Sequence, residues 1–268
     1  ARQSKEMIAL AREKNIFLME ALWSKFLPHY NMLQQTGNEG MITVNYGFAR
    51  YGTGADPVAN AAHLAADWVR YDNGRTKYWE IGNENFGSWE AGYRINTADN
   101  KDGQPEYLTG DLYGKHAKVF IDSMKNAAAE VGATIYIGTQ LVEHTAESWE
   151  PTLTKTWNTG VLPHVSTLTD YFIVHNYYTA YQTNAPASEI LLSAATATTK
   201  MTDVVSQALT AAGAANKPLA LTEYNIFSTG SQQMVSQVAG MHAVLVINEL
   251  MKSKYGFAAR WDLANGWE

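Results

Sequence analysis

The chain has 268 residues, a formal net charge of -6 and no cysteine, and 46% of its residues are hydrophobic against 17% charged. This composition supports a folded core and excludes a chain kept disordered by charge. Lys and Arg are scattered too thinly to hold a phosphate backbone, so we expect no nucleic-acid partner. The lack of cysteine excludes disulfides, a cysteine nucleophile and thiolate metal sites.

A length of 268 residues fits one α/β barrel domain over residues 1–268, since such barrels take about 250 residues as a single unit. No stretch approaches the roughly 20 consecutive apolar residues of a membrane span, so we expect no membrane partner. The chain begins at Ala1 without a basic and then apolar leader, and it ends at Glu268 soon after a strand-like segment. We therefore expect it to be a segment of a longer precursor.

Short apolar runs alternate with longer helical patterns, which is typical of βα units around a parallel sheet. Seven strands are predicted, at 16–23, 41–46, 78–82, 134–138, 171–175, 219–222 and 258–263. Four helices are predicted, at 57–70, 114–131, 187–212 and 232–252. An eight-stranded barrel needs one strand more. The expected fold class is thus α/β, a (β/α)8 TIM barrel whose first strand lies upstream of Ala1.

Polar residues that directly follow predicted strands are the first candidates for chemistry, because catalytic groups of parallel barrels lie where strands end. Asn83 and Glu84 end one strand within 78–87 (YWEIGNENFG), and Glu223 ends a later one within 219–225 (LALTEYN). Cleavage of a glycosidic bond needs two carboxyl groups, one to protonate the leaving oxygen and one to attack or to activate water. Glu84 and Glu223 supply such a pair, with no cofactor and no metal required.

Four segments in this order resemble clan A of the glycoside hydrolases: 79–84 (WEIGNE), 170–178 (DYFIVHNYY), 222–225 (TEYN) and 260–261 (RW). The likeness covers most of the chain, from about Met41 to Trp267. It implies a retaining enzyme, with the general acid/base at Glu84 after the fourth barrel strand and the nucleophile at Glu223 after the seventh. We also expect the neighbours of Glu84 to raise its pKa.

Within the clan, the sequence around Glu84 resembles that of the family 86 agarases and porphyranases. The next most similar groups are the arabinofuranosidases and xylosidases of families 51 and 39. Loops rich in aromatic residues after the strands favour a long cleft and hence endo action, and we expect the protein to be secreted or periplasmic. The resemblance implies a polysaccharide hydrolase. It also implies the substrate-binding residues. Asn83 would bind the sugar 2-hydroxyl, His175 with Tyr177 or Tyr178 would hold the nucleophile and the ring, and Trp261 would floor the cleavage subsite. Asn45, in the family-like segment 44–47, and Trp89, an aromatic residue after a strand, complete the expected set.

Other interpretations stay open beside this one. Strand alternation points Glu80 into the barrel, where it could pair with a buried Arg or Lys instead of reacting. His175 could be a core histidine, and Glu143, His144 and His175 could serve a metal-dependent hydrolase. The loop 96–106, rich in Asn, Asp and Gly, is expected on the same face as the chemistry. A sugar-binding barrel without turnover is a further alternative.

Overall fold

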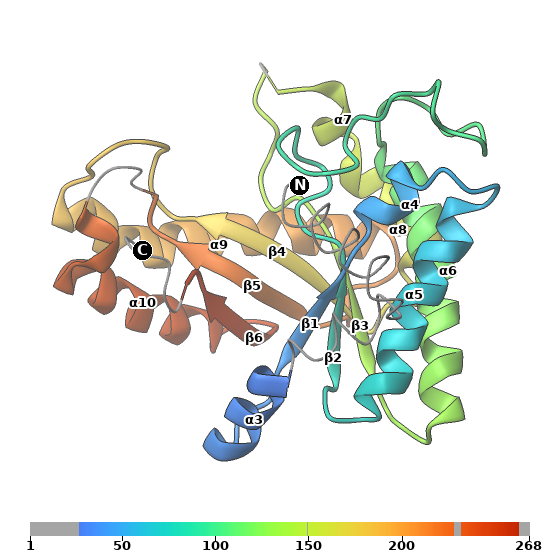
Figure 1. Cartoon of the computed structure of the whole chain (residues 1–268). Coiled ribbons are helices and arrows are strands. Elements are labelled where there is room, and N and C mark those ends of the chain that lie inside the picture. Colours follow the sequence, from blue (N-terminus) through green and yellow to red (C-terminus); the bar gives the residue numbers. More distant parts are fainter. Residues whose placement is uncertain (1–26, 149, 228–231, 263–268) are drawn as a thin grey trace.

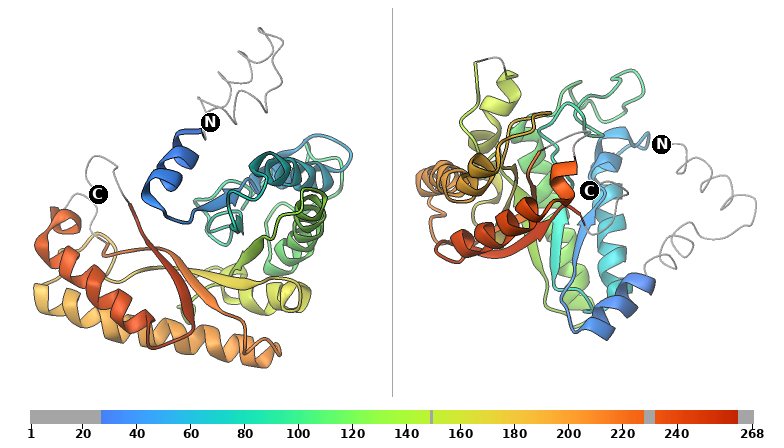
Figure 2. Two further views of the ribbon diagram at one scale, coloured as in Figure 1. Left: turned by 90° about the horizontal axis from the view of Figure 1, so that it is seen from below. Right: turned by 90° about the vertical axis from the view of Figure 1, so that its left-hand side faces the viewer.

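A computed structural model describes residues 27–148, 150–227 and 232–262 (Figure 1). Six parallel strands form one sheet in chain order, and the sheet curls into an incomplete barrel with the long helices on its convex side (Figure 2). The strands are β1 (Met41–Val44), β2 (Tyr78–Ile81), β3 (Tyr136–Gln140), β4 (Tyr171–Tyr177), β5 (Leu219–Asn225) and β6 (Tyr255–Arg260). This arrangement confirms the predicted barrel class. The strand predicted at 16–23 lies outside the described residues.

Long helices follow the strands as a βα barrel requires. They are α5 (Pro57–Asp72), α6 (Gly110–Glu130), α9 (Ala187–Ala211) and α10 (Gln237–Leu250). The segment 232–252, predicted as one helix, begins with a separate 3-10 turn, η1 (Gln232–Val235), ahead of α10. The shorter helices α3 (Leu27–Thr36), α4 (Gly47–Tyr51), α7 (Thr152–Lys155) and α8 (Trp157–Val165) were not predicted. Within the described residues, no helix has both the length and the apolar character needed to cross a membrane.

Side-chain caps fix where the principal helices begin. Asp56 accepts a hydrogen bond from the amide of Ala59 ahead of α5, and Thr109 accepts one from Leu112 ahead of α6. Each cap satisfies a backbone donor that has no partner within its helix, which stabilises the helix by about 1 kcal/mol. Because the strands are parallel, these two helices start near the same end of the sheet, and the caps fix the residues at which they start.

The outer face of the sheet packs against these helices, and Trp79 is its largest buried side chain. The Trp79 ring meets Trp68 of α5 edge-on at 6.0 Å, and its indole nitrogen donates to the carbonyl of Thr76. Trp79 and Ile81 point outward into this core, so strand alternation turns Tyr78 and Glu80 toward the barrel interior. The prediction that Glu80 points inward is consistent with this packing.

Aromatic rings fill the amino-terminal end of the barrel interior. Tyr78 stacks on Tyr136 at 5.6 Å and lies 6.5 Å from Phe257 of β6, so the curl of the sheet brings β2 and β6 together. Tyr171 donates a hydrogen bond to the carbonyl of Trp79 across the interior. Its ring covers Gly138, where a β-carbon would overlap the ring and lie 2.7 Å from Ile173. The sheet can close around Tyr171 because position 138 has no side chain.

The loop 96–106 is anchored by Arg50 of α4, which is 1% exposed. Its guanidinium donates to the carbonyls of Gly92, Pro105 and Glu106 and to the side chain of Gln104. Because α4 follows β1, the loop lies at the carboxyl end of the strands, as the sequence predicted. One buried cation thus organises a long polar segment by donating to several of its carbonyls.

Gly138→Ala should destabilise the fold by about 1–3 kcal/mol, because the added methyl group has to displace the buried Tyr171 ring. Gly240→Ala is the matched control. Gly240 lies in α10 with open space around its β-carbon, so alanine there should stabilise the helix slightly. Urea unfolding of the two variants measures both effects. Equal stabilities for the two would show that the interior around residue 138 is not closely packed.

Candidate active site

A tight turn after β2 directs Glu84 toward His175. Gly82 has φ +74°, and a β-carbon there would overlap the side chain of Asn85, so only glycine fits. Glu84 itself has φ +39°, a left-handed conformation that costs a non-glycine residue roughly 1–2 kcal/mol. The buried side chain of Gln140 on β3 accepts a hydrogen bond from the backbone amide of Asn85 at 3.0 Å, and this bond stabilises the turn.

A bulge in β5 turns two consecutive side chains into the same site. The pairing with β4 runs from Val174 opposite Leu221 directly to His175 opposite Glu223, which leaves Thr222 as the extra residue. Regular strands point neighbouring side chains to opposite faces, whereas a bulge re-aims one of them. Thr222 and Glu223 both reach side chains of β4 as a result.

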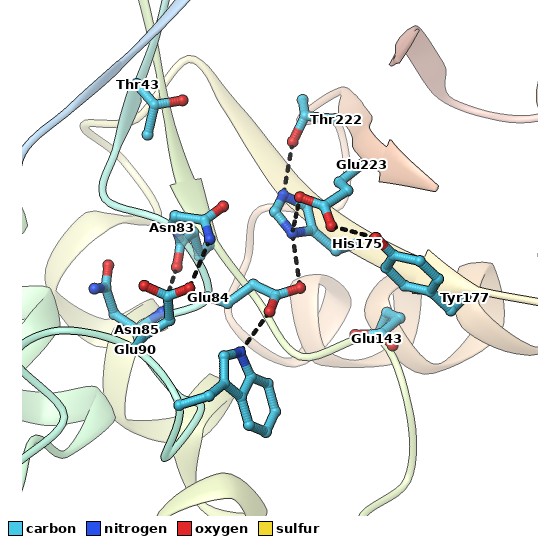
Figure 3. Close-up of polar contacts among 12 residues, drawn as sticks. Thr43, Asn83, Glu84, Asn85, Glu90, Glu143, His175, Tyr177, Thr222 and Glu223 are labelled. Atoms are coloured by element: carbon cyan, nitrogen blue, oxygen red, sulfur yellow. Dashed lines mark hydrogen bonds and ion pairs between the residues drawn. The ribbon is translucent and has the colours of Figure 1, made fainter. Parts of the chain in front are cut away.

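His175 lies between the two predicted catalytic carboxylates (Figure 3). Its Nδ1 is 3.0 Å from Oε1 of Glu84 and 3.7 Å from Oε2 of Glu223, while Nε2 lies 3.1 Å from the hydroxyl of Thr222. One ligand-type atom from each of the three charged residues lies within 4.8 Å of the others. The imidazole is 7% exposed and its ring nitrogens face polar partners, so the core-histidine alternative does not describe it.

The shared imidazole acts to lower the pKa of both carboxyl groups, but it prevails over burial only at Glu84. Burial acts to raise the pKa of Glu84, but the hydrogen bond and charge of His175, with a hydrogen bond from Trp89, outweigh it and lower that pKa. The expectation of a raised pKa at Glu84 is therefore wrong. Burial and the nearby Glu84 and Glu90 charges raise the pKa of Glu223 despite hydrogen bonding by Tyr177. The pKa of His175 is raised: burial opposes protonation, but the hydrogen bond to Glu84 and the charges of both carboxylates prevail.

Tyr177 and Tyr178 separate by strand alternation. The Tyr177 hydroxyl donates to Oε1 of Glu223 at 2.7 Å (Figure 3). Tyr178 points to the outer face, where its hydroxyl lies 2.9 Å from Thr198 of α9 and its ring meets His242 of α10. Tyr177 is therefore the residue that holds the predicted nucleophile. Tyr178 belongs to the core, which corrects its place among the substrate-binding residues.

Trp89 and Asn83 lie beside Glu84. The Trp89 indole, 69% exposed, donates to Oε2 of Glu84 at 2.7 Å, and the Asn83 amide donates to Glu90 at 3.0 Å. Sequence reasoning missed Glu90 and the role of Thr222. The sequence gives only a weak indication of Glu90, namely that this carboxylate directly follows Trp89 and lies six residues after Glu84. The contact of Thr222 depends on the β5 bulge, which the sequence does not reveal.

Asn45 directly follows β1, and Trp261 directly follows β6. The Asn45 side chain accepts a hydrogen bond from the amide of Phe48 and supports the start of α4. Trp261 is 42% exposed, and two hydrogen bonds fix its backbone. Its amide donates to the carbonyl of Tyr224, and its carbonyl accepts from the buried side chain of Asn225. A fixed backbone with an exposed ring suits a stacking surface. The sugar contacts of both residues remain predictions.

The residues considered for a metal-dependent alternative do not form one group. His144 lies 2.9 Å from Glu150 and 3.4 Å from Glu143, and these carboxylates raise its pKa to about 9. His175 instead joins Glu84 and Glu223, the group among the described residues whose spacing could hold an ion. Glu80 accepts a hydrogen bond from the hydroxyl of Thr43, and no ion pair among the described residues joins it to Arg or Lys. Burial raises its pKa.

No protein-family profile matches the sequence, and no curated protein matches it either. Solved structures do resemble the fold. A family 51 α-L-arabinofuranosidase from Bifidobacterium longum has a TM-score of 0.59 at 18% identity, over 88% of this chain and 49% of that one. A family 44 xyloglucanase from Paenibacillus polymyxa has a TM-score of 0.58 at 12% identity, over 89% and 59%.

A broad-specificity family 5 endoglucanase from an uncultured bacterium has a TM-score of 0.56 at 8% identity, over 93% of this chain and 69% of that one. The chain spans about half the length of the arabinofuranosidase and somewhat more of the other two. Likeness at such low identity is a likeness of fold. These similarities place the chain among TIM barrels, here with an acidic site at the carboxyl ends of its strands.

Tyr177→Phe should raise the pKa of Glu223 further, because the variant loses a hydrogen bond that favours the charged carboxylate. Tyr178→Phe is the matched control, since its hydroxyl contacts Thr198 on the outer face and should leave that pKa unchanged. NMR titration of carboxyl-labelled glutamate measures the pKa in each variant. An unchanged Glu223 pKa in Tyr177→Phe would contradict the contact.

Proposed function

We propose that this protein is a retaining glycoside hydrolase, with Glu84 as general acid/base and Glu223 as nucleophile. The observation that carries the proposal is the convergence of these carboxylates on His175 from the ends of β2 and β5, with oxygens within 4.8 Å. Retaining enzymes hold their two carboxyl groups about 5–5.5 Å apart, whereas inverting enzymes need about 6.5–9.5 Å to admit a water. The short separation supports retention.

In the first step a carboxylate oxygen of Glu223 forms a bond to the anomeric carbon as the glycosidic bond breaks, and Glu84 gives its proton to the departing oxygen. Water then attacks the glycosyl ester, Glu84 takes the proton from that water, and Glu223 leaves as a carboxylate. Tyr177 donates to Glu223 and orients it for attack. Atoms and charge balance across the two steps without a cofactor.

The proton for Glu84 comes from His175 in this scheme. The pKa of His175 is raised and that of Glu84 is lowered, which favours a proton on the imidazole over one on the carboxyl group. Transfer over the 3.0 Å from Nδ1 to Oε1 leaves a neutral imidazole and a protonated Glu84. Thr222, at 3.1 Å from Nε2, accepts the hydrogen that the neutral ring keeps. The hydrogen-bonded pair thus supplies an acid in spite of the lowered pKa of Glu84.

The substrate that we propose is a polysaccharide cleaved internally, of the agar or porphyran type. Support for it comes from the sequence around Asn83 and Glu84 and from the exposed rings of Trp89 and Trp261, which suit the apolar faces of sugar rings. Such a substrate lies outside the cell, so we propose a secreted or periplasmic protein.

A second candidate is an α-L-arabinofuranosidase or xylosidase. The similarity to the Bifidobacterium longum family 51 arabinofuranosidase favours it, because that structure combines a TM-score of 0.59 with 18% identity. A sugar-binding barrel without turnover is the alternative from another class. Release of reducing ends from a panel of agar, porphyran, arabinan and xylan distinguishes all three.

Glu84→Gln should lower the hydrolysis rate of the polysaccharide by several orders of magnitude, because the amide cannot protonate the leaving oxygen. The loss should be much smaller on an aryl glycoside whose leaving group needs no proton. Steady-state kinetics on both substrates measure the difference, and Glu189→Gln, at an exposed carboxylate in the first turn of α9, is the control.

Equal losses on the two substrates would remove Glu84 from the acid/base role. Binding of a polysaccharide by the wild-type protein without any release of reducing ends would instead establish the sugar-binding alternative.

A further inference from the structure

Two consecutive side chains of the turn after β2, Trp89 and Glu90, form hydrogen bonds with the side chains of Glu84 and Asn83 at the start of that turn. Trp89 donates from its indole to Oε2 of Glu84 at 2.7 Å, and Glu90 accepts from the amide nitrogen of Asn83 at 3.0 Å (Figure 3). The first contact fixes the expected acid/base. The second fixes Asn83, which the resemblance to clan A implies as the residue that binds the sugar 2-hydroxyl.

The backbone between these pairs is built to bring them together. The amide of Gly87 donates to the carbonyl of Glu84 at 2.7 Å, and the amide of Glu90 donates to the carbonyl of Gly87 at 3.1 Å. A β-carbon at Gly87 would overlap the Trp89 ring, so the ring lies flat against this glycine. Phe86 contacts Trp89 edge-on and packs against the buried Trp157. The turn is thus anchored to the core although the Trp89 indole is exposed.

The Glu90 carboxylate determines how the Asn83 amide is oriented. A side-chain amide has a donor end and an acceptor end, and an ionised carboxylate only accepts hydrogen bonds. The contact therefore directs the nitrogen of Asn83 to Glu90 and leaves its carbonyl oxygen and second N–H for another partner. A hydrogen bond to a charged acceptor is roughly twice as strong as a neutral one, so it favours one orientation of the amide over the flipped one.

The position of Glu90 also places a third negative charge near the site. Its charge contributes to the raised pKa of Glu223, together with burial and the charge of Glu84. Residue 90 is half-buried, so the charge is only partly screened by solvent. Replacement of this carboxylate should therefore be visible at Asn83 and, more weakly, in the titration of Glu223.

We propose that Glu90 is a positioning residue that sets the Asn83 amide to recognise the sugar hydroxyl next to the anomeric carbon, and thereby a determinant of substrate specificity. The proposal rests on the proposed glycosidase function. It deepens that function, because it names a residue outside the carboxylate pair through which the enzyme distinguishes a sugar with this hydroxyl from one without it. Glu90 touches neither reacting atom and acts through Asn83.

The test uses Glu90→Ala and Glu90→Gln with an aryl glycoside of the sugar that the polysaccharide panel identifies, and with its 2-deoxy analogue. Glu90→Ala should lower kcat/KM on the full sugar about 10- to 100-fold, the range expected for a lost hydrogen bond to a charged group. The loss on the 2-deoxy analogue should be much smaller. Glu90→Gln, whose side-chain oxygen can still accept from Asn83, should recover most of the activity.

A double-mutant cycle with Asn83→Ala adds a second readout. The losses of Glu90→Ala and Asn83→Ala should not add, because both remove the same oriented amide. Glu130→Ala, at an exposed carboxylate of α6 paired with Arg70, is the control for a general effect of charge removal. Equal loss on both sugars, additive losses, or a Glu90→Ala variant as active as wild type would each overturn the proposal.

A measurement on the free protein separates this proposal from the proposed function. The side-chain amide signals of Asn83 in a nitrogen-15 NMR spectrum should differ between the wild type and Glu90→Ala, which lacks the acceptor. Glu90→Gln, whose side-chain oxygen still accepts from Asn83, should bring them back toward the wild-type positions. Amide signals that ignore Glu90 would overturn the positioning role even in an active enzyme. Failure of the proposed function would show differently, as a wild-type protein that hydrolyses no glycoside at all.

Discussion

The contact of one buried imidazole with two carboxylates is the interaction on which the site depends. His175 lies 3.0 Å from Glu84 and 3.7 Å from Glu223, and its own pKa is raised while that of Glu84 is lowered. Two carboxylates this close cannot both ionise without cost, and a proton shared with the imidazole offsets that cost. Removal of the imidazole would leave two partly buried carboxylates to repel each other, so the contact stabilises the placement of the strand ends.

The barrel makes this contact possible because parallel strands bring their carboxyl ends to one edge. Each of the three residues reaches the centre by a different local device. Glu84 depends on a left-handed turn after Gly82, His175 on ordinary strand alternation, and Glu223 on the bulge at Thr222. The bulge and the turn both depart from regular β geometry, and both lie at the site.

Strand alternation and strand-end chemistry could be read from the sequence, which is why the six described strands and the Glu84 and Glu223 pair were predicted. The bulge at Thr222 could not, because it depends on pairing between strands 40 or more residues apart. The contacts of Glu90 and the lowered pKa of Glu84 depend on tertiary placement in the same way. The choice between Tyr177 and Tyr178 needed only the register of β4, since consecutive residues face opposite sides. Short helices such as α8, which contains Pro163, lack the long apolar stripe that revealed α5.

The central claim, that Glu223 attacks the anomeric carbon, is tested most directly by trapping the covalent intermediate. An activated 2-deoxy-2-fluoro glycoside of the cleaved sugar slows both steps but leaves the first one faster, so the glycosyl ester accumulates. Mass spectrometry of the digested protein should then show one sugar added to the peptide that contains Glu223. A protein that turns over the natural substrate but carries the label on another carboxylate, or none at all, would contradict the account.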